Sequence, residues 1–232
     1  MSRPTLVLVL VGGFLGGVVG AAFVWAAQNG FISGGGARTY QVALRADMPR
    51  MVPGILAYLL FALYSSFAAG QAAQAQSTEP RWSTTLHQGL ILIAFAAIIL
   101  PIPGLAARFV PSAGWVVAVG LVVELGGIVL AVLARRALGR NWSAEVRLSV
   151  DHELVRAGVY RRLRHPISAG VLLTYLGLAL QSGRPNALAG VARAAAAYWR
   201  KIGLEEQLLK ARFGKAFEDW RKGSWALIPP PL

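Results

Sequence analysis

The chain has 232 residues, of which 56% are hydrophobic and only 14% are charged. Soluble domains carry about 25% charged residues, so this composition excludes an ordinary soluble enzyme and favours a membrane protein. The net charge is +13, but no known nucleic-acid-reading motif accompanies it, and we expect no nucleic-acid partner. The chain has no cysteine, and its three histidines lack metal-ligand spacing, so we expect no metal.

Four apolar runs have the length of membrane-spanning helices, which need about 20 residues to cross a bilayer. They cover residues 5–27, 52–73, 85–100 and 113–133. The first run is longer than the core of a signal peptide, about 7–15 residues, and therefore predicts a retained span. Its glycines at four-residue spacing allow another backbone to approach closely, either inside the bundle or at a homo-oligomer interface.

The segments around these runs are more polar. We interpret residues 28–50, which contain three consecutive glycines, as a flexible connector. After a basic loop, two short apolar arms at 167–181 and 187–199 flank a turn and predict a helical hairpin. Apolar residues at helical spacing then predict an amphipathic helix over residues 201–220.

The predicted fold is all-α: a polytopic membrane helical bundle of four spans, a C-terminal helical hairpin and an amphipathic cytoplasmic helix. We divide the chain into N-terminal transmembrane spans, residues 1–134, and a C-terminal core, residues 135–232. Seventeen of the 23 lysines and arginines lie in the second part. Basic segments beside spans usually face the cytoplasm and attract anionic lipids, so we expect the second part to be cytoplasmic. The composition, rich in alanine, glycine and arginine, is typical of GC-rich bacterial genomes and favours a bacterial inner-membrane protein.

Three features of the C-terminal part carry candidate chemistry. Arg164-His165-Pro166 directly precedes an apolar helix, whose free N–H groups suit an anionic ligand group. Glu205-Glu206 follows a basic pair on the final helix, and Gly158-Val159-Tyr160 forms a turn with an aromatic residue. Each feature alone also fits a structural role, as an interfacial histidine or a solvated charged face.

Together these features are specific. The stretch LVRAGVYRRLRHP, a hairpin, LEEQLLKARFGKAFEDW and a final IP resemble the signature of the isoprenylcysteine carboxyl methyltransferase family, to which phospholipid N-methyltransferases are related. The resemblance covers about residues 138–230. Two departures from the family pattern lie around the acceptor side as much as the cofactor side: Ser168 replaces the family's tyrosine, and Lys201 replaces its usual arginine.

The resemblance implies methyl transfer from S-adenosylmethionine, in a pocket built by the basic loop, the RHP helix start and the final helix. It implies catalytic roles for Lys201, facing the acceptor, and Glu205, at the polar end of the cofactor. The residues expected to bind the cofactor by match to the family are His152, Leu154, Val155, Tyr160, His165, Pro166, Ser168 and Glu205.

The acceptor stays open at this point. A lipophilic small molecule, a phospholipid and a prenylated acceptor all fit a membrane-embedded methyltransferase. A carboxylate acceptor needs a cation such as Arg200 or Lys201 to orient it, whereas an amine needs a base, for which Glu124 and Glu145 are candidates. Glu124 lies in the middle of the fourth apolar run, where a carboxylate usually faces the bundle interior or bonds a neighbouring span.

Two other functions compete with methyl transfer. Sterol reductases resemble the same C-terminal core but use NADPH, whose 2′-phosphate would require an arginine clamp. A non-catalytic membrane protein that kept the fold is the other alternative, suggested by the changes at Ser168 and Lys201.

Overall fold

The computed structural model describes residues 35–69, 75–78, 80–102, 105, 107–111, 113–139, 147–149 and 154–227. The predicted first span, with its glycines, lies outside these residues. In the described part, six α-helices form the structure: α2 Gly35–Ala69, α3 Arg81–Ile99, α4 Gly114–Leu138, α5 Pro166–Ser182, α6 Pro185–Phe213 and α7 Lys215–Lys222. A short 3₁₀ turn, η2 (Gly158–Arg161), precedes α5.

Three of these helices are long and apolar enough to cross a membrane, namely Met48–Ala68 within α2, the whole of α3 and the whole of α4. Large hydrophobic side chains on them are exposed, as lipid-facing side chains are; Leu60 and Val122 are 68% and 70% exposed. The predicted class, a helical membrane bundle, is confirmed. Helices α3 and α4 follow the third and fourth predicted runs, with α4 extending to Gly139, whose φ of 53° ends the helix.

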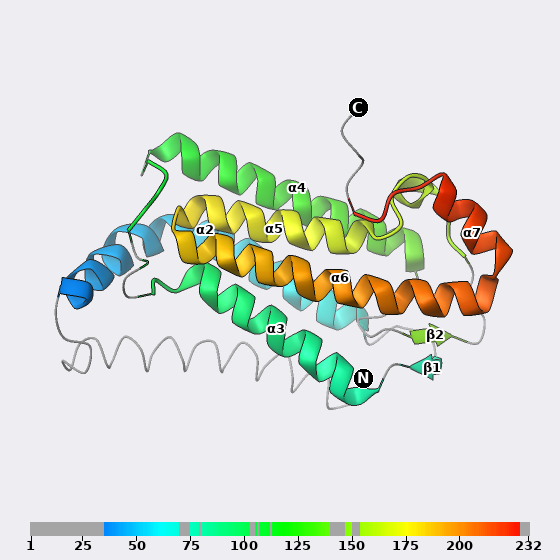
Figure 1. Cartoon of the computed structure of the whole chain (residues 1–232). Helices are drawn as coiled ribbons and strands as arrows, with labels where there is room; N and C mark the ends of the chain where they lie inside the picture. Colours follow the sequence, from blue (N-terminus) through cyan, green and yellow to red (C-terminus); the bar gives the residue numbers. More distant parts are fainter. Residues whose placement is uncertain are drawn as a thin grey trace.

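Helix α5 lies at the centre of the bundle. It packs against α4 on one side and α6 on the other, α3 packs against α6, and α2 crosses behind α4 and α5 (Figure 1). Its sequence is apolar all round, which is typical of a helix surrounded by others. The core cluster joins α3, α5 and α6 and consists of Ala94, Ile98, Val171, Tyr175, Leu178, Ala179, Ala187 and Ala194.

Four glycines bring α4 and α5 into backbone contact. A Cβ added to Gly177 would lie 2.5 Å from the Gly120 carbonyl oxygen, and one added to Gly170 would lie 2.5 Å from the Gly127 carbonyl oxygen. The two pairs repeat at seven residues on both helices, so small residues line the whole crossing. This contact fixes where α5, and the loop before it, sit against α4.

The turn between α5 and α6 also closes the end of α3. Gly183 takes a left-handed φ of 63°, which a glycine adopts without strain. Asn186 then donates to the carbonyls of Ala97 and Leu100 at 2.6 and 2.8 Å, and Arg184 donates to that of Ile99 at 2.7 Å. These side chains satisfy carbonyl groups that the helix end leaves unpaired.

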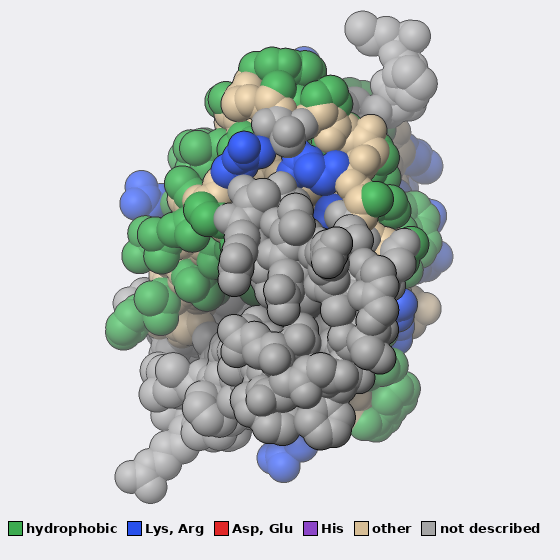
Figure 2. Space-filling view, turned by 90° about the vertical axis from the view of Figure 1, so that its left-hand side faces the viewer, with side chains coloured by type: hydrophobic (Ala, Val, Ile, Leu, Met, Phe, Trp, Pro, Cys, Tyr) green, Lys and Arg blue, Asp and Glu red, His purple; other side chains and the backbone are tan. Residues whose placement is uncertain are grey.

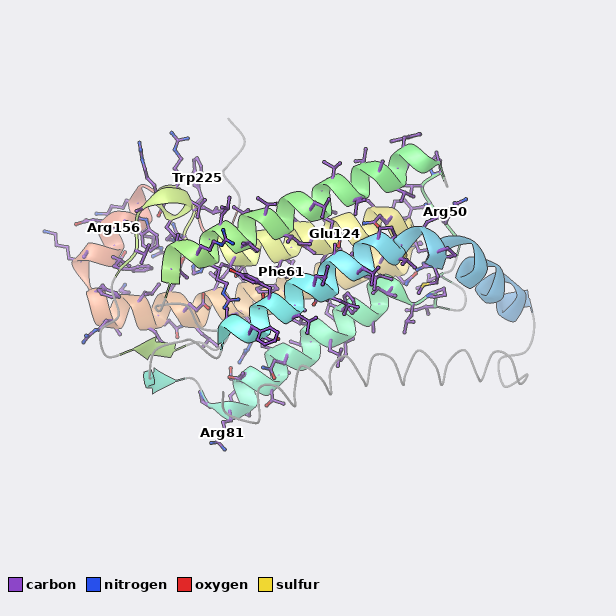
Figure 3. The ribbon with its side chains drawn as sticks, turned by 180° about the vertical axis from the view of Figure 1, so that it is seen from behind. Arg50, Phe61, Arg81, Glu124, Arg156 and Trp225 are labelled. Carbon is purple, nitrogen blue, oxygen red and sulfur yellow. The ribbon has the colours of Figure 1, made fainter. Side chains whose placement is uncertain are left out.

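The predicted connector over residues 28–50 is wrong from Gly35 onward, because α2 begins there. Apart from its glycines, this stretch contains mainly good helix formers such as alanine, leucine and arginine. Pro49 and Pro53 lie inside the helix, which bends near Arg50 instead of ending (Figure 3).

The predicted division between a short second hairpin arm and a final helix over 201–220 is also wrong. Helix α6 continues without a break from Pro185 to Phe213, through the change from apolar to charged residues. The break comes at Gly214, whose φ of 48° ends α6, and α7 follows in a new direction (Figure 1). The charged C-terminal part of α6 is therefore a direct continuation of the helix that packs in the bundle.

Two segments that the sequence suggested were loops pair as short strands. Strand β1 (Ala75–Thr78) runs antiparallel to β2 (Arg147–Ser149), with Thr78 opposite Arg147. This ribbon lies at the same end of the molecule as α7 (Figure 1). It does not alter the helical class.

Figure 2 shows the opposite end of the bundle, with hydrophobic side chains at its edges and basic side chains between them. Arg50, Arg108 and Arg184 belong to this end, whereas Arg135 and Arg136 close α4 at the other. Because arginines occur at both ends, they do not by themselves determine which end faces the cytoplasm. The orientation and the two-part division of the chain stay predictions.

Candidate functional site

The site forms where the RHP segment enters α5. Pro166 occupies the first position of the helix, where its missing N–H costs nothing, and His165 before it has a non-helical φ of −124°. Upstream, Gly158 with φ 58° turns the chain into η2, which buries Tyr160. The sequence therefore folds locally to present His165 at the base of α5, beside the charged part of α6.

His165 lies between two carboxylates of α6. Its Nδ1 is 3.1 Å from Glu205 Oε2, and its Nε2 is 3.2 Å from Glu206 Oε1. The imidazole is only 5% exposed, while the two carboxylates are 27% and 18% exposed. Adjacent residues on a helix point about 100° apart, so this clamp requires the ring to stand edge-on between them.

Three basic residues surround this clamp. Arg164 Nε donates to Glu206 Oε1 at 2.9 Å, and Arg221 Nε lies 3.8 Å from Glu206 Oε2. Lys201 Nζ lies 3.6 Å from Glu205 Oε1, one helical turn earlier. With a protonated His165, the cluster holds four cationic groups and two carboxylates, which favours a ligand that brings an anionic group.

These contacts shift the proton affinities of the clamp. Burial alone raises the pKa of Glu205, but the charge of Lys201 and the hydrogen bond to His165 outweigh it and lower that pKa to about 2. Glu206 is likewise lowered to a pKa of about 2, against its burial, by His165 and Arg164. Burial lowers the pKa of His165, but both carboxylates raise it above 6.5 on balance. At neutral pH both acids are therefore ionised.

The end of the chain forms one wall of the site. The backbone N–H of Arg164 donates to the Trp225 carbonyl at 2.7 Å, and that of His165 to Ala226 at 3.1 Å. Trp220 Nε1 donates to the Tyr160 carbonyl at 3.1 Å. Residues 220–226, here named the strap, thus pair with the RHP segment although some 60 residues separate them in sequence.

The structure brings together five of the residues expected from the sequence: Tyr160, His165, Pro166, Lys201 and Glu205. The Glu205 charge adds to burial in raising the pKa of Tyr160, so the two lie within electrostatic reach. Ser168 is buried in the first turn of α5, while Leu154 and Val155 are half-buried just before η2. Their assigned roles toward a cofactor stay predictions.

Glu124, His152 and Glu145 are not among the residues that the structure brings to the clamp. Glu124 is buried in the middle of α4 and accepts a hydrogen bond from Gln181 at 2.7 Å, as expected for a structural bond to a neighbouring helix. Gln181 lies 15 residues after Pro166, or about 22 Å along α5, so Glu124 is remote from the clamp (Figure 3). His152 and Glu145 lie outside the described residues.

Arg200 points away from the clamp although it directly precedes Lys201. Its guanidinium donates to Ser83 Oγ at 2.5 Å and lies 5.6 Å above the Trp82 ring, both at the start of α3. Arg200 therefore belongs to the interface between α3 and α6 rather than to the Glu205 cluster.

Known proteins resemble this arrangement. The model of the phospholipid methyltransferase family matches residues 115–216, the part that contains α4, the clamp and α6. A probable protein-S-isoprenylcysteine O-methyltransferase of Oryza sativa subsp. indica is 31% identical over 114 residues, covering 48% of this chain and 60% of the rice protein. Protein-S-isoprenylcysteine O-methyltransferase A of Arabidopsis thaliana is 27% identical over 146 residues, covering 60% of this chain and 70% of that protein.

A solved structure shares the fold. The structure of the eukaryotic intramembrane Ras methyltransferase ICMT superposes with a TM-score of 0.52 and 21% sequence identity, covering 97% of this chain and 92% of that one. The resemblance to the isoprenylcysteine carboxyl methyltransferase family is thereby confirmed. The chain spans about 60% of the length of the rice relative that it matches, so the activity of that relative is not transferred with the resemblance.

Within this isoprenylcysteine methyltransferase-like fold, three further residues belong to the site, and sequence reasoning had assigned none of them a binding or catalytic role. Glu206 holds His165 as directly as Glu205 does, and Arg164 and Arg221 hold Glu206. The signal was present for two of them, because Arg164 and Glu206 belong to the RHP and EE motifs themselves. Nothing in the sequence marked Arg221, which the turn at Gly214 brings back to the site.

Proposed function

We propose that the chain transfers a methyl group from S-adenosylmethionine to a lipophilic acceptor at the cytoplasmic face of the membrane. The observation that carries this proposal is the clamp of His165 between Glu205 and Glu206 at the end of a membrane bundle, in a fold shared with a Ras methyltransferase. The names of the relatives support the reaction class. Their printed substrate, isoprenylcysteine, is one of the acceptors that this chain can be tested with.

The residues of the clamp fit S-adenosylmethionine. That cofactor carries a cationic sulfonium and an amino-acid end with both charges. Glu205 is ionised and a quarter exposed, so its carboxylate remains open to a cationic ligand group. Lys201 beside it offers a cation to an anionic group, and the first turn of α5 offers free backbone N–H groups.

When bound, the cofactor supplies an electrophilic methyl group whose transfer is an in-line displacement. The chain's own residues then have to bind and orient both partners and keep water away. Tyr160 and His165, both buried, exclude water from one side of the clamp. Lys201 orients an anionic acceptor by its charge, and it holds Glu205 ionised.

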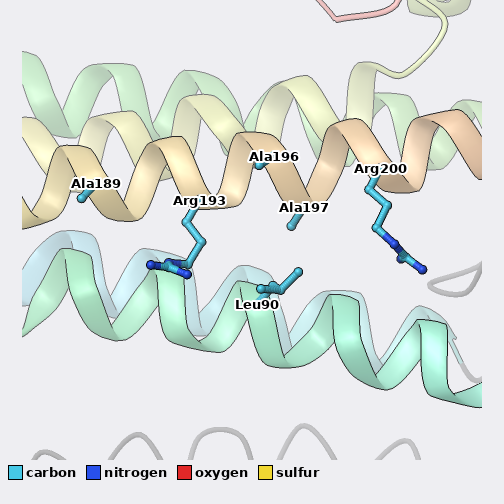
Figure 4. A pocket seen from close by; sticks show the side chains of 6 residues that line it. All are labelled: Leu90, Ala189, Arg193, Ala196, Ala197 and Arg200. Atoms are coloured by element: carbon cyan, nitrogen blue, oxygen red, sulfur yellow. The ribbon is translucent and has the colours of Figure 1, made fainter.

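A groove between α3 and α6 supports a lipophilic acceptor. Its volume is about 380 Å³, and its lining consists of Leu90, Ala189, Arg193, Ala196, Ala197 and Arg200 (Figure 4). The small side chains of the alanines leave space along one face of α6, and Arg193 and Arg200 project from that face toward α3. Ligand pockets have about 300–1,000 Å³, so the groove has room for an alkyl or isoprenoid chain.

The charges of this groove favour an acceptor with an anionic group. Neither α3 nor the part of α6 before Glu205 contains an aspartate or glutamate. Arg193 lines the same groove as Leu90, which is nine residues from either end of α3, or about 14 Å from each end. A charge at that depth in a membrane is costly without an anionic or strongly polar partner. A carboxylate or a phospholipid therefore fits better than a plain lipophilic amine.

Binding of S-adenosylmethionine to the detergent-purified protein, measured by calorimetry, tests this function. We expect micromolar binding by the wild type, strong weakening in Glu205→Gln, and no change in the control Asp219→Asn, an exposed acid on α7. Binding of NADPH instead would establish the reductase alternative. Binding of neither ligand would refute methyl transfer and favour a non-catalytic protein.

A further inference from the structure

Glu206 makes more contacts than the clamp alone requires. It accepts from His165 and from Arg164 on the same oxygen, while its second oxygen lies 3.8 Å from Arg221 at the start of the strap. We propose that Glu206 is a positioning residue that holds His165 as an imidazolium and docks the strap, residues 220–226, against the RHP segment. The link between Glu206 and the methyl donor rests on the proposed function. The roles of Glu206 in holding His165 and in docking the strap rest on the contacts of these residues.

The chemistry of the His165 ring requires a second proton in this arrangement. An ionised carboxylate only accepts hydrogen bonds, so a ring whose two nitrogens both face carboxylates satisfies both contacts only when both nitrogens carry hydrogen. The distances of 3.1 and 3.2 Å are those of hydrogen bonds on both sides. Removing the charge of Glu206 removes one of the two carboxylates that stabilise the doubly protonated ring.

The exposed fractions of Glu205 and Glu206 indicate different roles for the two acids. Glu205 is the more exposed, and its other neighbour, Lys201, is 3.6 Å away, a long contact that a ligand can replace. Glu206 is less exposed, and its Oε1 receives two hydrogen bonds, from Arg164 at 2.9 Å and from His165 at 3.2 Å. Glu205 is therefore the acid that can turn to a ligand, and Glu206 is the one that keeps the ring in place when it does.

The same residues tie the strap to the site. Arg164 donates through Nη1 to the carbonyls of Arg221 and Ser224, with its Nε on Glu206. The Trp225 N–H donates to the Arg162 carbonyl, and the Trp225 carbonyl accepts from the Arg164 N–H. Glu206 fixes the guanidinium that makes these bonds, so loss of its charge frees both the ring and the strap.

Every charged or titratable group that the described elements place against His165 bears on this prediction. Glu205, Glu206 and Lys201 come from α6, Arg164 from the loop and Arg221 from α7. The Tyr160 and Tyr198 phenols lie within electrostatic reach of Glu205, and burial raises the pKa of both, so both stay neutral. Of these groups, His165 is the one whose charge changes near neutral pH, because the pKa values of both acids are lowered to about 2 and that of His165 is raised from 6.5.

Nuclear magnetic resonance of histidine-labelled protein tests the proposal directly, since the chain has only three histidines. In the wild type we expect His165 to stay an imidazolium above pH 6.5, with slow hydrogen exchange at the amides of Arg164, His165 and Trp225. In Glu206→Gln we expect the titration midpoint to fall by about one pH unit and these amides to exchange faster. Asp219→Asn, an exposed acid of α7 whose ion-pair partner is Lys222, is the control and leaves both readouts unchanged.

The binding of S-adenosylmethionine adds a pH signature that a merely structural role lacks. We expect Glu206→Gln to lose about tenfold in affinity near pH 8 and much less near pH 6, where the ring stays charged. An equal loss at both pH values, or an unchanged His165 midpoint, would overturn the proposal. If Glu206→Gln does not fold, two other measurements decide: the His165 titration midpoint in the wild type and the amide exchange rates of the strap in Arg221→Gln. A wild-type midpoint no higher than 6.5, together with unchanged exchange in Arg221→Gln, overturns the proposal. A wild type that binds no S-adenosylmethionine refutes the proposed function, while the midpoint and exchange rates still decide on Glu206.

Discussion

The close crossing of α4 and α5 predicts a large difference between two glycine-to-alanine substitutions. At Gly177 an added methyl group would lie 2.5 Å from the Glu124 backbone nitrogen and the Gly120 carbonyl oxygen. At Gly126, on the lipid-facing side of α4, an added methyl group meets nothing within 4 Å. Both substitutions replace a helical glycine, so both gain about 1 kcal/mol of helix propensity.

The steric cost therefore appears as the difference between the two variants. An ordinary contact needs about 3.4 Å, so Gly177→Ala forces the two backbones apart by roughly 1 Å along a crossing of two glycine pairs. Overpacking of this kind costs about 1–3 kcal/mol. For a chain of this size, about 1 kcal/mol shifts the melting temperature by roughly 2–4 °C. Gly177→Ala should then melt about 2–12 °C below Gly126→Ala.

Thermal unfolding in detergent, followed by circular dichroism at matched protein concentration, measures this difference. Gly126→Ala should be as stable as the wild type or slightly more stable. Equal melting temperatures for the two variants would show that α4 and α5 do not approach this closely, and would refute the placement of the RHP segment that depends on them.

Further predictions concern the helix end, the pH range and the strap. Asn186→Ala removes the side chain that caps α3, and should lower the free energy of unfolding by about 1–3 kcal/mol, measured by the same melting assay. The lowered pKa values of Glu205 and Glu206 contribute stability above pH 4.5 that is lost as pH falls toward 2, whereas the raised pKa of His165 contributes stability below pH 6.5 that is lost as pH rises through its folded value. The melting temperature of the wild type minus that of His165→Gln should therefore decline on the alkaline side; a constant difference would contradict the clamp. Trp220→Phe removes the hydrogen bond to η2 and should speed proteolysis of the strap at unchanged melting temperature, which limited digestion would detect.

The membrane helices were predictable because their signal is local. The lengths of the apolar runs give the approximate lengths of α3 and α4, and Pro101 and Gly139 lie where these helices end. The start of α2 was missed because its polar residues and consecutive glycines were interpreted as a connector, whereas the helix formers among them sustain a helix that bends near Pro49 and Pro53. The length of α6 was missed because composition changes near Lys201, whereas helical backbone depends on propensity and not on polarity.

The site was predictable in its motifs and not in its contacts. The RHP and EE segments stand out in the sequence, yet the hydrogen bonds of His165 join residues 40 and 41 positions apart. No local pattern indicates that both ring nitrogens would face carboxylates of the protein itself. The strap was hidden for the same reason, since Trp225 meets Leu163 only after α6 and α7 have turned the chain back.

Transfer of a labelled methyl group tests the central claim most directly. Membranes containing the protein would be incubated with S-adenosylmethionine labelled in its methyl group, and the label extracted into organic solvent would be counted. The account predicts label in the lipid extract with the wild type and with Asp219→Asn, and its loss with Glu205→Gln. Cofactor binding without any transfer to lipid, to an isoprenylcysteine or to another amphiphilic acceptor would contradict the account and show a protein that kept the fold without the reaction.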